Sequence, residues 1–99
     1  MPARHRITFA LSAVVDLEEV RRWHVEQGAP QVGERLLGEI VAVVERLADF
    51  PESGRVVPEF GVEGLREIVH PPFRIVYRLE AERVRIVRVW RSERLLRLP

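Results

Sequence analysis

Three strand-like runs follow one another in the last third of the chain with no helix between them, and this feature limits the fold most. They are Leu65–His70, Phe73–Leu79 and Val84–Trp90. Pro71 and Pro72 separate the first two runs, and residues 80–83 form the turn between the second and the third. Such closely spaced strands pair as antiparallel hairpins, because a parallel pair needs a much longer crossover connection.

A strand and two helices are expected before these hairpins. Residues 6–10 are typical of a short strand, and Ser12 is expected to cap a helix that ends at Gly28. Pro30 suits the first turn of a second helix, which ends before Pro51. The second helix carries an apolar stripe wider than one buried face requires. Its members are Leu36, Leu37, Ile40, Val41, Val43, Val44 and Leu47.

Together these elements predict one α+β domain over residues 1–99. Residues 51–64 contain two prolines and three glycines and are expected to form a loop. The predicted order is β-α-α-β-β-β, with a two-helix hairpin packed on one face of a mostly antiparallel four-stranded sheet. This arrangement leaves the other face of the sheet for function.

The composition limits the compartment and the class of protein. The chain has no cysteine, so neither a disulfide framework nor a thiolate metal site is available. The basic start of the chain is followed by no apolar signal core. No apolar run approaches the roughly 18 residues that a membrane span needs. We therefore expect a cytoplasmic protein that makes no membrane contact.

Positive charge is concentrated in the C-terminal third. All 16 basic residues are arginine, and the formal net charge of the chain is only +1. Residues 65–99 nevertheless hold nine arginines against four acidic residues. This asymmetry indicates an anionic partner for that part of the fold. Arginine remains protonated at ordinary pH and therefore cannot act as a general base.

The middle strand shows which side chains would line the two sheet faces. Side chains alternate along a strand, so Phe73, Ile75, Tyr77 and Leu79 share one face. Arg74, Val76 and Arg78 then share the other face. Two arginines on an open sheet face are a candidate site for phosphate or carboxylate. The alternative is an ordinary solvent-exposed face, where arginines are common.

These strands resemble those of the RelE/ParE toxins of type II toxin–antitoxin modules. The string from Leu65 to His70 is followed by Phe73–Arg78, and the family signature is an aromatic residue followed by Arg-Ile-Val-Tyr. Further matches are Ala13, Asp16 and Leu17, then Leu47, Pro51 and Gly54, and finally Val87–Trp90 with Arg94. Their order and spacing agree over nearly the whole chain, which makes the set more specific than any one motif.

The resemblance implies a genetically linked antitoxin that wraps the toxin in a hetero-oligomer. It also implies one of two activities, which a shared fold does not separate. ParE-like members inhibit DNA gyrase, whereas RelE-like members cleave messenger RNA on the ribosome. A third reading is a degenerate relative that only binds its antitoxin.

Most of the candidate site residues are arginines, and few of them could act as a general acid or a general base. By resemblance, Arg74 and Arg94 stand where RelE-like nucleases bind phosphate, and Arg91 stands where many relatives carry histidine. Cleavage through a 2′-hydroxyl also needs a general base and a general acid. If the chain is a nuclease, Glu67, His70 or Glu93 must supply them. We therefore favour the non-enzymatic gyrase inhibitor, with target-binding residues Arg74, Arg78, Arg91 and Arg94.

The remaining polar and aromatic residues indicate no cofactor. His5, His24 and His70 lack the spacing of metal ligands and have no acidic cluster beside them. Trp23 lies beside the apolar face of the first helix. It is either a contact at the rim of the core, which we favour, or a surface anchor for a partner.

Overall fold

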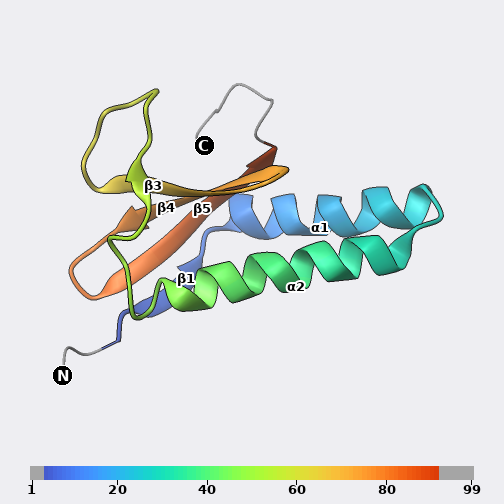
Figure 1. Cartoon of the computed structure of the whole chain (residues 1–99), viewed down its shortest axis with the longest axis horizontal. Helices are drawn as coiled ribbons and strands as arrows, with labels where there is room; N and C mark the ends of the chain where they lie inside the picture. The colour runs from blue at the N-terminus through green and yellow to red at the C-terminus, as the bar shows by residue number, and fades with distance from the viewer. Residues whose placement is uncertain (1–3, 92–99) are drawn as a thin grey trace.

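The computed structural model describes residues 4–91 and contains two helices and five strands (Figure 1). In chain order these are β1 (Arg6–Phe9), α1 (Leu11–Glu26), α2 (Pro30–Arg46), β2 (Arg55–Val56), β3 (Leu65–His70), β4 (Phe73–Leu79) and β5 (Arg83–Arg91). The bounds of β3 and β4 agree with the sequence prediction. Among the described residues, no helix has the length and apolarity needed to cross a membrane.

The strands form one mixed sheet in the order β1-β5-β4-β3-β2. Neighbouring strands are antiparallel with one exception: β1 pairs in parallel with β5. The predicted α+β class and element order are confirmed. Four strands were predicted, and the fifth is β2, a two-residue strand inside the predicted loop that pairs with β3.

Both helices cover the same face of the sheet, as Figure 1 shows. The main core lies between them and the sheet. Its large members are Ile40, Val44, Leu47, Phe73, Ile75, Tyr77, Val84 and Ile86. Tyr77 and its alternate neighbours therefore face the helices, as the period of two predicts. Most of the wide α2 stripe is used in this core, and among its members Val41 is the most exposed, at 44%.

The start of α1 differs from the prediction that Ser12 caps it. The helix begins at Leu11, and the residue at its N-cap, Ala10, makes no side-chain capping bond. Instead, the Ser12 hydroxyl donates a hydrogen bond of 2.6 Å to the backbone carbonyl of Val87 in β5. A serine at a helix start can satisfy either the helix or a neighbouring strand, and here the strand is its partner.

The second sheet face is partly covered rather than open. Val57 and Leu65, on either side of the exposed residues 58–63, pack on this face in a second apolar cluster. That cluster contains Ala10, Val57, Leu65, Val76 and Val87, with Trp90 packed at its border. The loop is fixed at its start by Tyr77, whose hydroxyl donates to the carbonyl of Pro51 at 2.7 Å and accepts from the amide of Gly54 at 3.0 Å. The sheet face opposite the helices, which was predicted to be open for function, is therefore only partly accessible.

Candidate functional site

Arg74 lies in a buried ionic cluster on the sheet face opposite the helices. The Arg74 Nε donates to Glu67 Oε1 at 2.6 Å. Its two terminal nitrogens donate to the two oxygens of Glu59 at 2.6 and 2.7 Å. Glu59 belongs to the loop over this face, so the loop covers the guanidinium, and Arg74 is only 8% exposed. The expectation of an open arginine pair therefore fails at Arg74, although its predicted face is correct.

Glu67 joins this cluster to the edge of the sheet. Its carboxylate lies between two arginines, because Oε2 accepts from Arg55 Nε at 2.7 Å while Oε1 accepts from Arg74. The Glu67 side chain has no exposed surface. Four side chains, Arg55, Glu67, Arg74 and Glu59, thus form one continuous chain of charge-assisted hydrogen bonds.

The charges in this cluster stabilise one another. The hydrogen bonds from Arg74 lower the pKa of Glu59 to about 2. The bonds to Glu59 in turn raise the pKa of Arg74 above its usual range. Both groups therefore stay ionised throughout the physiological pH range, and an incoming phosphate would have to displace Glu59 to reach Arg74.

His70 lies on the opposite face of the sheet from this cluster. It pairs across the hairpin with Phe73, which is part of the main core, so its side chain points toward the helices. The His70 Nε2 lies 2.9 Å from Glu39 Oε1 in α2, and this hydrogen bond lowers the pKa of Glu39. The sheet thus separates His70 from Arg74 and Glu67, so these three predicted residues do not meet at one site.

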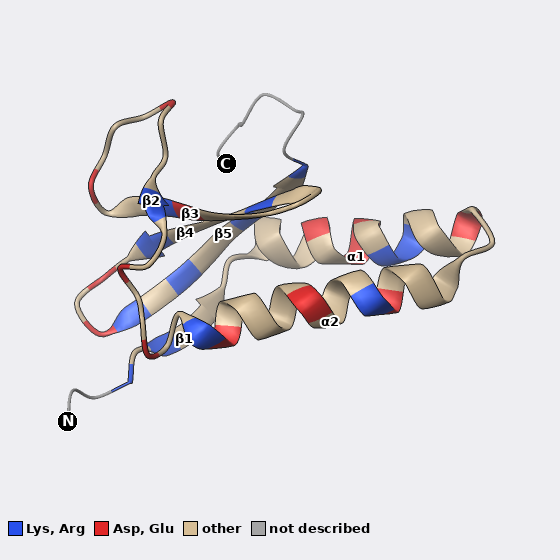
Figure 2. Cartoon of the chain, in the orientation of Figure 1, with Lys and Arg blue, Asp and Glu red and all other residues tan. Residues whose placement is uncertain are grey.

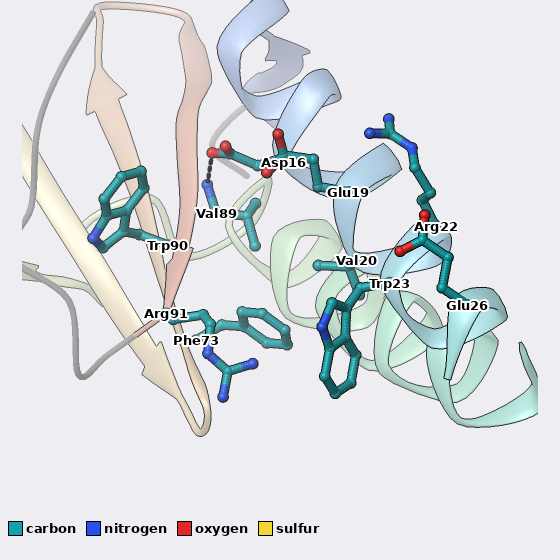
Figure 3. A pocket seen from close by; sticks show the side chains of 10 residues that line it. All are labelled: Asp16, Glu19, Val20, Arg22, Trp23, Glu26, Phe73, Val89, Trp90 and Arg91. Atoms are coloured by element: carbon teal, nitrogen blue, oxygen red, sulfur yellow. Dashed lines mark hydrogen bonds between the residues drawn. The ribbon is translucent and has the colours of Figure 1, made fainter. Parts of the chain in front are cut away.

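A groove runs between α1 and the C-terminal end of β5, with a volume of about 420 Å³ (Figure 3). We call it the α1–β5 groove. Its lining residues are Asp16, Glu19, Val20, Arg22, Trp23, Glu26, Phe73, Val89, Trp90 and Arg91. In Figure 3, Phe73 and Trp23 extend from the sheet and from α1 into the space between them. The groove therefore combines an apolar floor with charged residues along its margins.

Trp23 is the most prominent apolar group of this groove. We expected it to contact the rim of the core, but 53% of its surface is exposed. Its neighbour His24 is buried instead, with Nδ1 2.8 Å from the carbonyl of Val20 and with its Cβ close to Gly33 of α2. The close approach of α1 to α2 at Gly33 therefore turns His24 inward and leaves Trp23 on the surface.

Asp16 closes the end of the groove and is a residue whose role the sequence did not reveal. Its carboxylate accepts hydrogen bonds from Arg88 Nε at 2.8 Å, from Arg88 Nη2 at 2.9 Å and from the amide of Val89 at 2.9 Å. The only local signal was its position in the motif shared with the toxin family, because its partners lie more than 70 residues away.

The other predicted arginines lie apart from one another. Arg78 is exposed on β4, on the face away from the helices, where Figure 2 shows positive charges across the strands. Arg91 lines the α1–β5 groove at the end of β5. Arg94 and Glu93 lie outside the described residues. Within residues 4–91, no group of three or more histidine and acidic side chains could hold a metal ion.

Comparisons with known proteins agree on the family. The sequence model described as "ParE toxin of type II toxin-antitoxin system, parDE" matches residues 7–96. A chain of the chromosomal ParDE system from P. aeruginosa superposes with a TM-score of 0.76 at 23% identity, covering 91% of this chain and 98% of that one. A chain of the RelBE2 toxin–antitoxin complex from Mycobacterium tuberculosis gives 0.68 at 19% identity, covering 91% and 100%.

These two structural likenesses establish the fold, and the sequence model establishes the family. No curated protein sequence matches the chain. The matched region spans both helices and all five strands of the sheet. The chain belongs to the ParE toxin family of type II toxin–antitoxin systems.

Proposed function

We propose that this toxin inhibits DNA gyrase when it is not bound to its antitoxin, and that it is not a nuclease. The observation that carries the second part is that the candidate catalytic groups within residues 4–91 are divided between the two sheet faces. Arg74 and Glu67 are on one face, and His70 is on the other. General acid–base catalysis requires its groups within hydrogen-bond reach of the same reacting atoms.

The bonding of these residues argues in the same direction. Three nitrogens of Arg74 already donate to carboxylates, and both oxygens of Glu67 already accept from arginines. A phosphate that replaced Glu59 would also leave a carboxylate without its partner. Stabilisation of a transition state relies on donors aimed in advance at the developing charge, and here those donors are aimed at the protein itself.

We propose further that the antitoxin places an apolar segment in the α1–β5 groove. The two solved relatives are named as toxin–antitoxin systems or complexes. In this chain α1 buries only Ala13, Asp16 and His24 and leaves several large apolar residues on its surface. Of these residues Trp23 lines the groove, and an exposed apolar group rimmed by polar residues is a feature of protein–protein interaction sites. Tryptophan is frequent among the residues that carry most of the binding energy of such interfaces.

The test of antitoxin binding uses Trp23→Ala with Val41→Ala as its control. Truncation of a central interface tryptophan costs about 2 kcal/mol or more, so the dissociation constant for the antitoxin should rise at least roughly 30-fold. Val41 is also an exposed apolar residue, but it lies on α2 outside the groove, so its truncation should change affinity less than about two-fold. Equal affinities for Trp23→Ala and the wild type would place the antitoxin elsewhere.

The test of the target compares two kinds of damage after induction in a sensitive host. A gyrase inhibitor should cause DNA double-strand breaks and should block supercoiling by purified gyrase. A ribosome-dependent nuclease should shorten messenger RNA before any DNA damage appears. Efficient cleavage of ribosome-bound messenger RNA by the purified wild-type toxin would overturn the proposal.

A further inference from the structure

The arginines of the sheet, apart from Arg91 at the end of β5, fall into two groups according to their partners. Most of them are held by a carboxylate or by backbone carbonyls. These are Arg55, Arg66, Arg74, Arg83 and Arg88. In contrast, the side chains of Arg6, Arg78 and Arg85 make no hydrogen bond or ion pair with any residue of the described part of the chain. We call these three the arginine surface.

The three side chains lie together on the face of the sheet away from the helices. Arg78 of β4 pairs directly with Arg85 of β5. Arg85 pairs in turn with Thr8 of β1, and Arg6 is two residues before Thr8 on the same face. Neighbouring strands are only about 4.8 Å apart, so the three side chains form a continuous group across β1, β5 and β4.

This arrangement opposes the stability of the sheet. Like charges directly opposite each other on paired strands are destabilising. The hairpin tip nearby holds Glu80 and Glu82; Glu80 is bound to Arg83 at 2.6 Å, and after this bond the charges of Arg85 and Arg78 also lower the pKa of Glu80. Counting Arg6, Arg78, Arg83 and Arg85 against those two acids leaves this corner at 4 − 2 = +2, compared with +1 for the whole chain. Positive charge is therefore concentrated on one exposed corner of a nearly neutral protein.

We propose that the arginine surface binds the phosphate backbone of duplex DNA. Arginine presents its donors in a planar fork that fits phosphate oxygens. Single-stranded nucleic acid is bound largely by stacking on aromatic rings, and no aromatic residue belongs to this surface. Trp90, further along β5, is covered by Arg88, whose Cζ lies 4.1 Å from the centroid of the ring. The choice of DNA over RNA rests on the proposed action on DNA gyrase, an enzyme whose substrate is duplex DNA.

The arginine surface is distinct from the α1–β5 groove. The two share no residue, and β5 connects them, with Arg85 in its first half and Arg91 at its end. Six residues of extended strand span about 20 Å. A segment bound in the groove can therefore leave the arginines accessible to DNA, so the toxin can use one surface for each partner.

The experiment measures the salt dependence of binding to a fluorescent 20-base-pair duplex by the purified full-length toxin, without gyrase. Each phosphate contact contributes about 0.9 to the slope of log K against log salt concentration. The triple variant R6Q/R78Q/R85Q should therefore lose up to about 2.7 from that slope. The matched control is Arg46→Gln, which removes an exposed arginine of α2 on the helical side of the molecule and should change the slope by much less.

The variant is expected to remain folded, because it removes repulsion and no hydrogen bond. A thermal melting temperature at or above that of the wild type checks this, and Arg78→Gln alone provides a milder second variant. An unchanged slope in folded variants would overturn the proposal. So would tighter binding of the wild type to an RNA duplex than to DNA of the same sequence.

Failure of the proposed gyrase action is recognised separately. If the wild type binds the duplex through these arginines but does not inhibit purified gyrase, the proposed function fails while the DNA-binding surface stands. If instead the triple variant binds duplex DNA normally but no longer binds gyrase in the absence of DNA, the surface recognises an acidic protein and the proposal is wrong.

Discussion

Glu59 changes what its neighbour Arg74 can do. Alone on a strand, Arg74 would offer its donors to an anionic ligand. With Glu59 bound at 2.6 and 2.7 Å and Glu67 behind it, the same guanidinium instead holds the loop of residues 57–64 on the sheet. The partners and the burial of Arg74 therefore give this residue a structural role in place of a binding role.

Replacement of Glu59 by glutamine should weaken the fold and change its response to acid. The loss of two charge-assisted hydrogen bonds at a partly exposed site should lower the free energy of unfolding by about 1–2 kcal/mol at pH 7. The hydrogen bonds from Arg74 hold the folded-state pKa of Glu59 at about 2, below the ordinary glutamate value of 4.5. Its ionisation therefore contributes stability that is complete above pH 4.5 and is lost as the pH falls toward 2.

Urea unfolding from pH 7 down to pH 2 measures both effects. The difference between the wild type and Glu59→Gln should shrink steadily below pH 4.5. Glu63→Gln in the same loop is the control, since the Glu63 side chain makes no ion pair in the described structure, and it should stay within about 0.5 kcal/mol of the wild type. A constant difference at all pH values would contradict the assigned role of Glu59.

Two glycines should respond to alanine in opposite ways. A Cβ at Gly54 would lie 2.5 Å from the Tyr77 hydroxyl and 2.7 Å from the carbonyl of Glu67, so Gly54→Ala should destabilise by about 1–3 kcal/mol or more. At Gly38, within α2, a Cβ meets nothing within 4 Å. Gly38→Ala should therefore stabilise by roughly 0.5–1 kcal/mol. Thermal melting of both variants checks the signs, and a neutral Gly54→Ala would mean that Tyr77 has room to shift.

At the scale of the elements, α1 bonds to the part of the β5 edge that β1 does not reach. β1 pairs with β5 only as far as Phe9 opposite Ile86, so residues 87–91 of β5 pair with β4 on one side and have no strand on the other. Ser12 and Asp16 of α1 then bind the carbonyl of Val87 and the amide of Val89. The first half of α1 is thus fixed against this edge, and the second half of the helix is left to form one wall of the groove.

Asp16→Asn should loosen this attachment. The side chains of Asp16 and Arg88 are 8% and 16% exposed, and loss of one partner from a buried ion pair costs about 3–5 kcal/mol. Because this pair retains some contact with solvent, we expect about 2–3 kcal/mol. Asp49→Asn is the matched control, since its ion pair with Arg4 is at least half exposed and should contribute less than about 1 kcal/mol. Chemical denaturation compares the two, and equal losses would refute the role of Asp16 at the strand edge.

At the scale of the whole molecule, helices on one side of the sheet give the toxin two surfaces of different chemistry. The α1–β5 groove is largely apolar on its floor and lies where the helices meet the end of the sheet. The arginine surface lies on the other face, toward the opposite end of β5. The sheet and the core between these surfaces allow each one to be altered without the other.

Antitoxin affinity should therefore be insensitive to the arginine surface. Sites more than about 7–10 Å apart with no shared partner usually contribute additively, within about 0.5 kcal/mol. The variant R78Q/R85Q should bind antitoxin within about two-fold of the wild type, and adding these changes to Trp23→Ala should not alter the loss caused by Trp23→Ala alone. Isothermal titration of the four proteins measures this coupling. Coupling of more than ten-fold would mean that the antitoxin extends across both surfaces.

The sequence by itself determined both helices, every strand except β2, and the faces of the strands. The bounds of β3 and β4 follow from the alternation of side chains and from the prolines between them, which are local properties of the chain. The turn at residues 80–83 even implies the pairing of Arg78 with Arg85, so Arg85 could have been identified from the predicted hairpin alone. The family resemblance rested on the same local strings, and the family match over residues 7–96 confirms it.

Only the tertiary structure decided how the polar side chains are used. Ser12 binds a strand rather than its own helix, Trp23 lies on the surface while His24 is buried, and Glu59 covers Arg74. In each case the deciding partner is distant in sequence: Val87 is 75 residues from Ser12, and Arg74 is 15 from Glu59. The periodicity of the sequence predicts the face on which a side chain lies, but it does not predict the partner of that side chain. The partner depends on long-range packing, which determines which hydrogen bonds and ion pairs form.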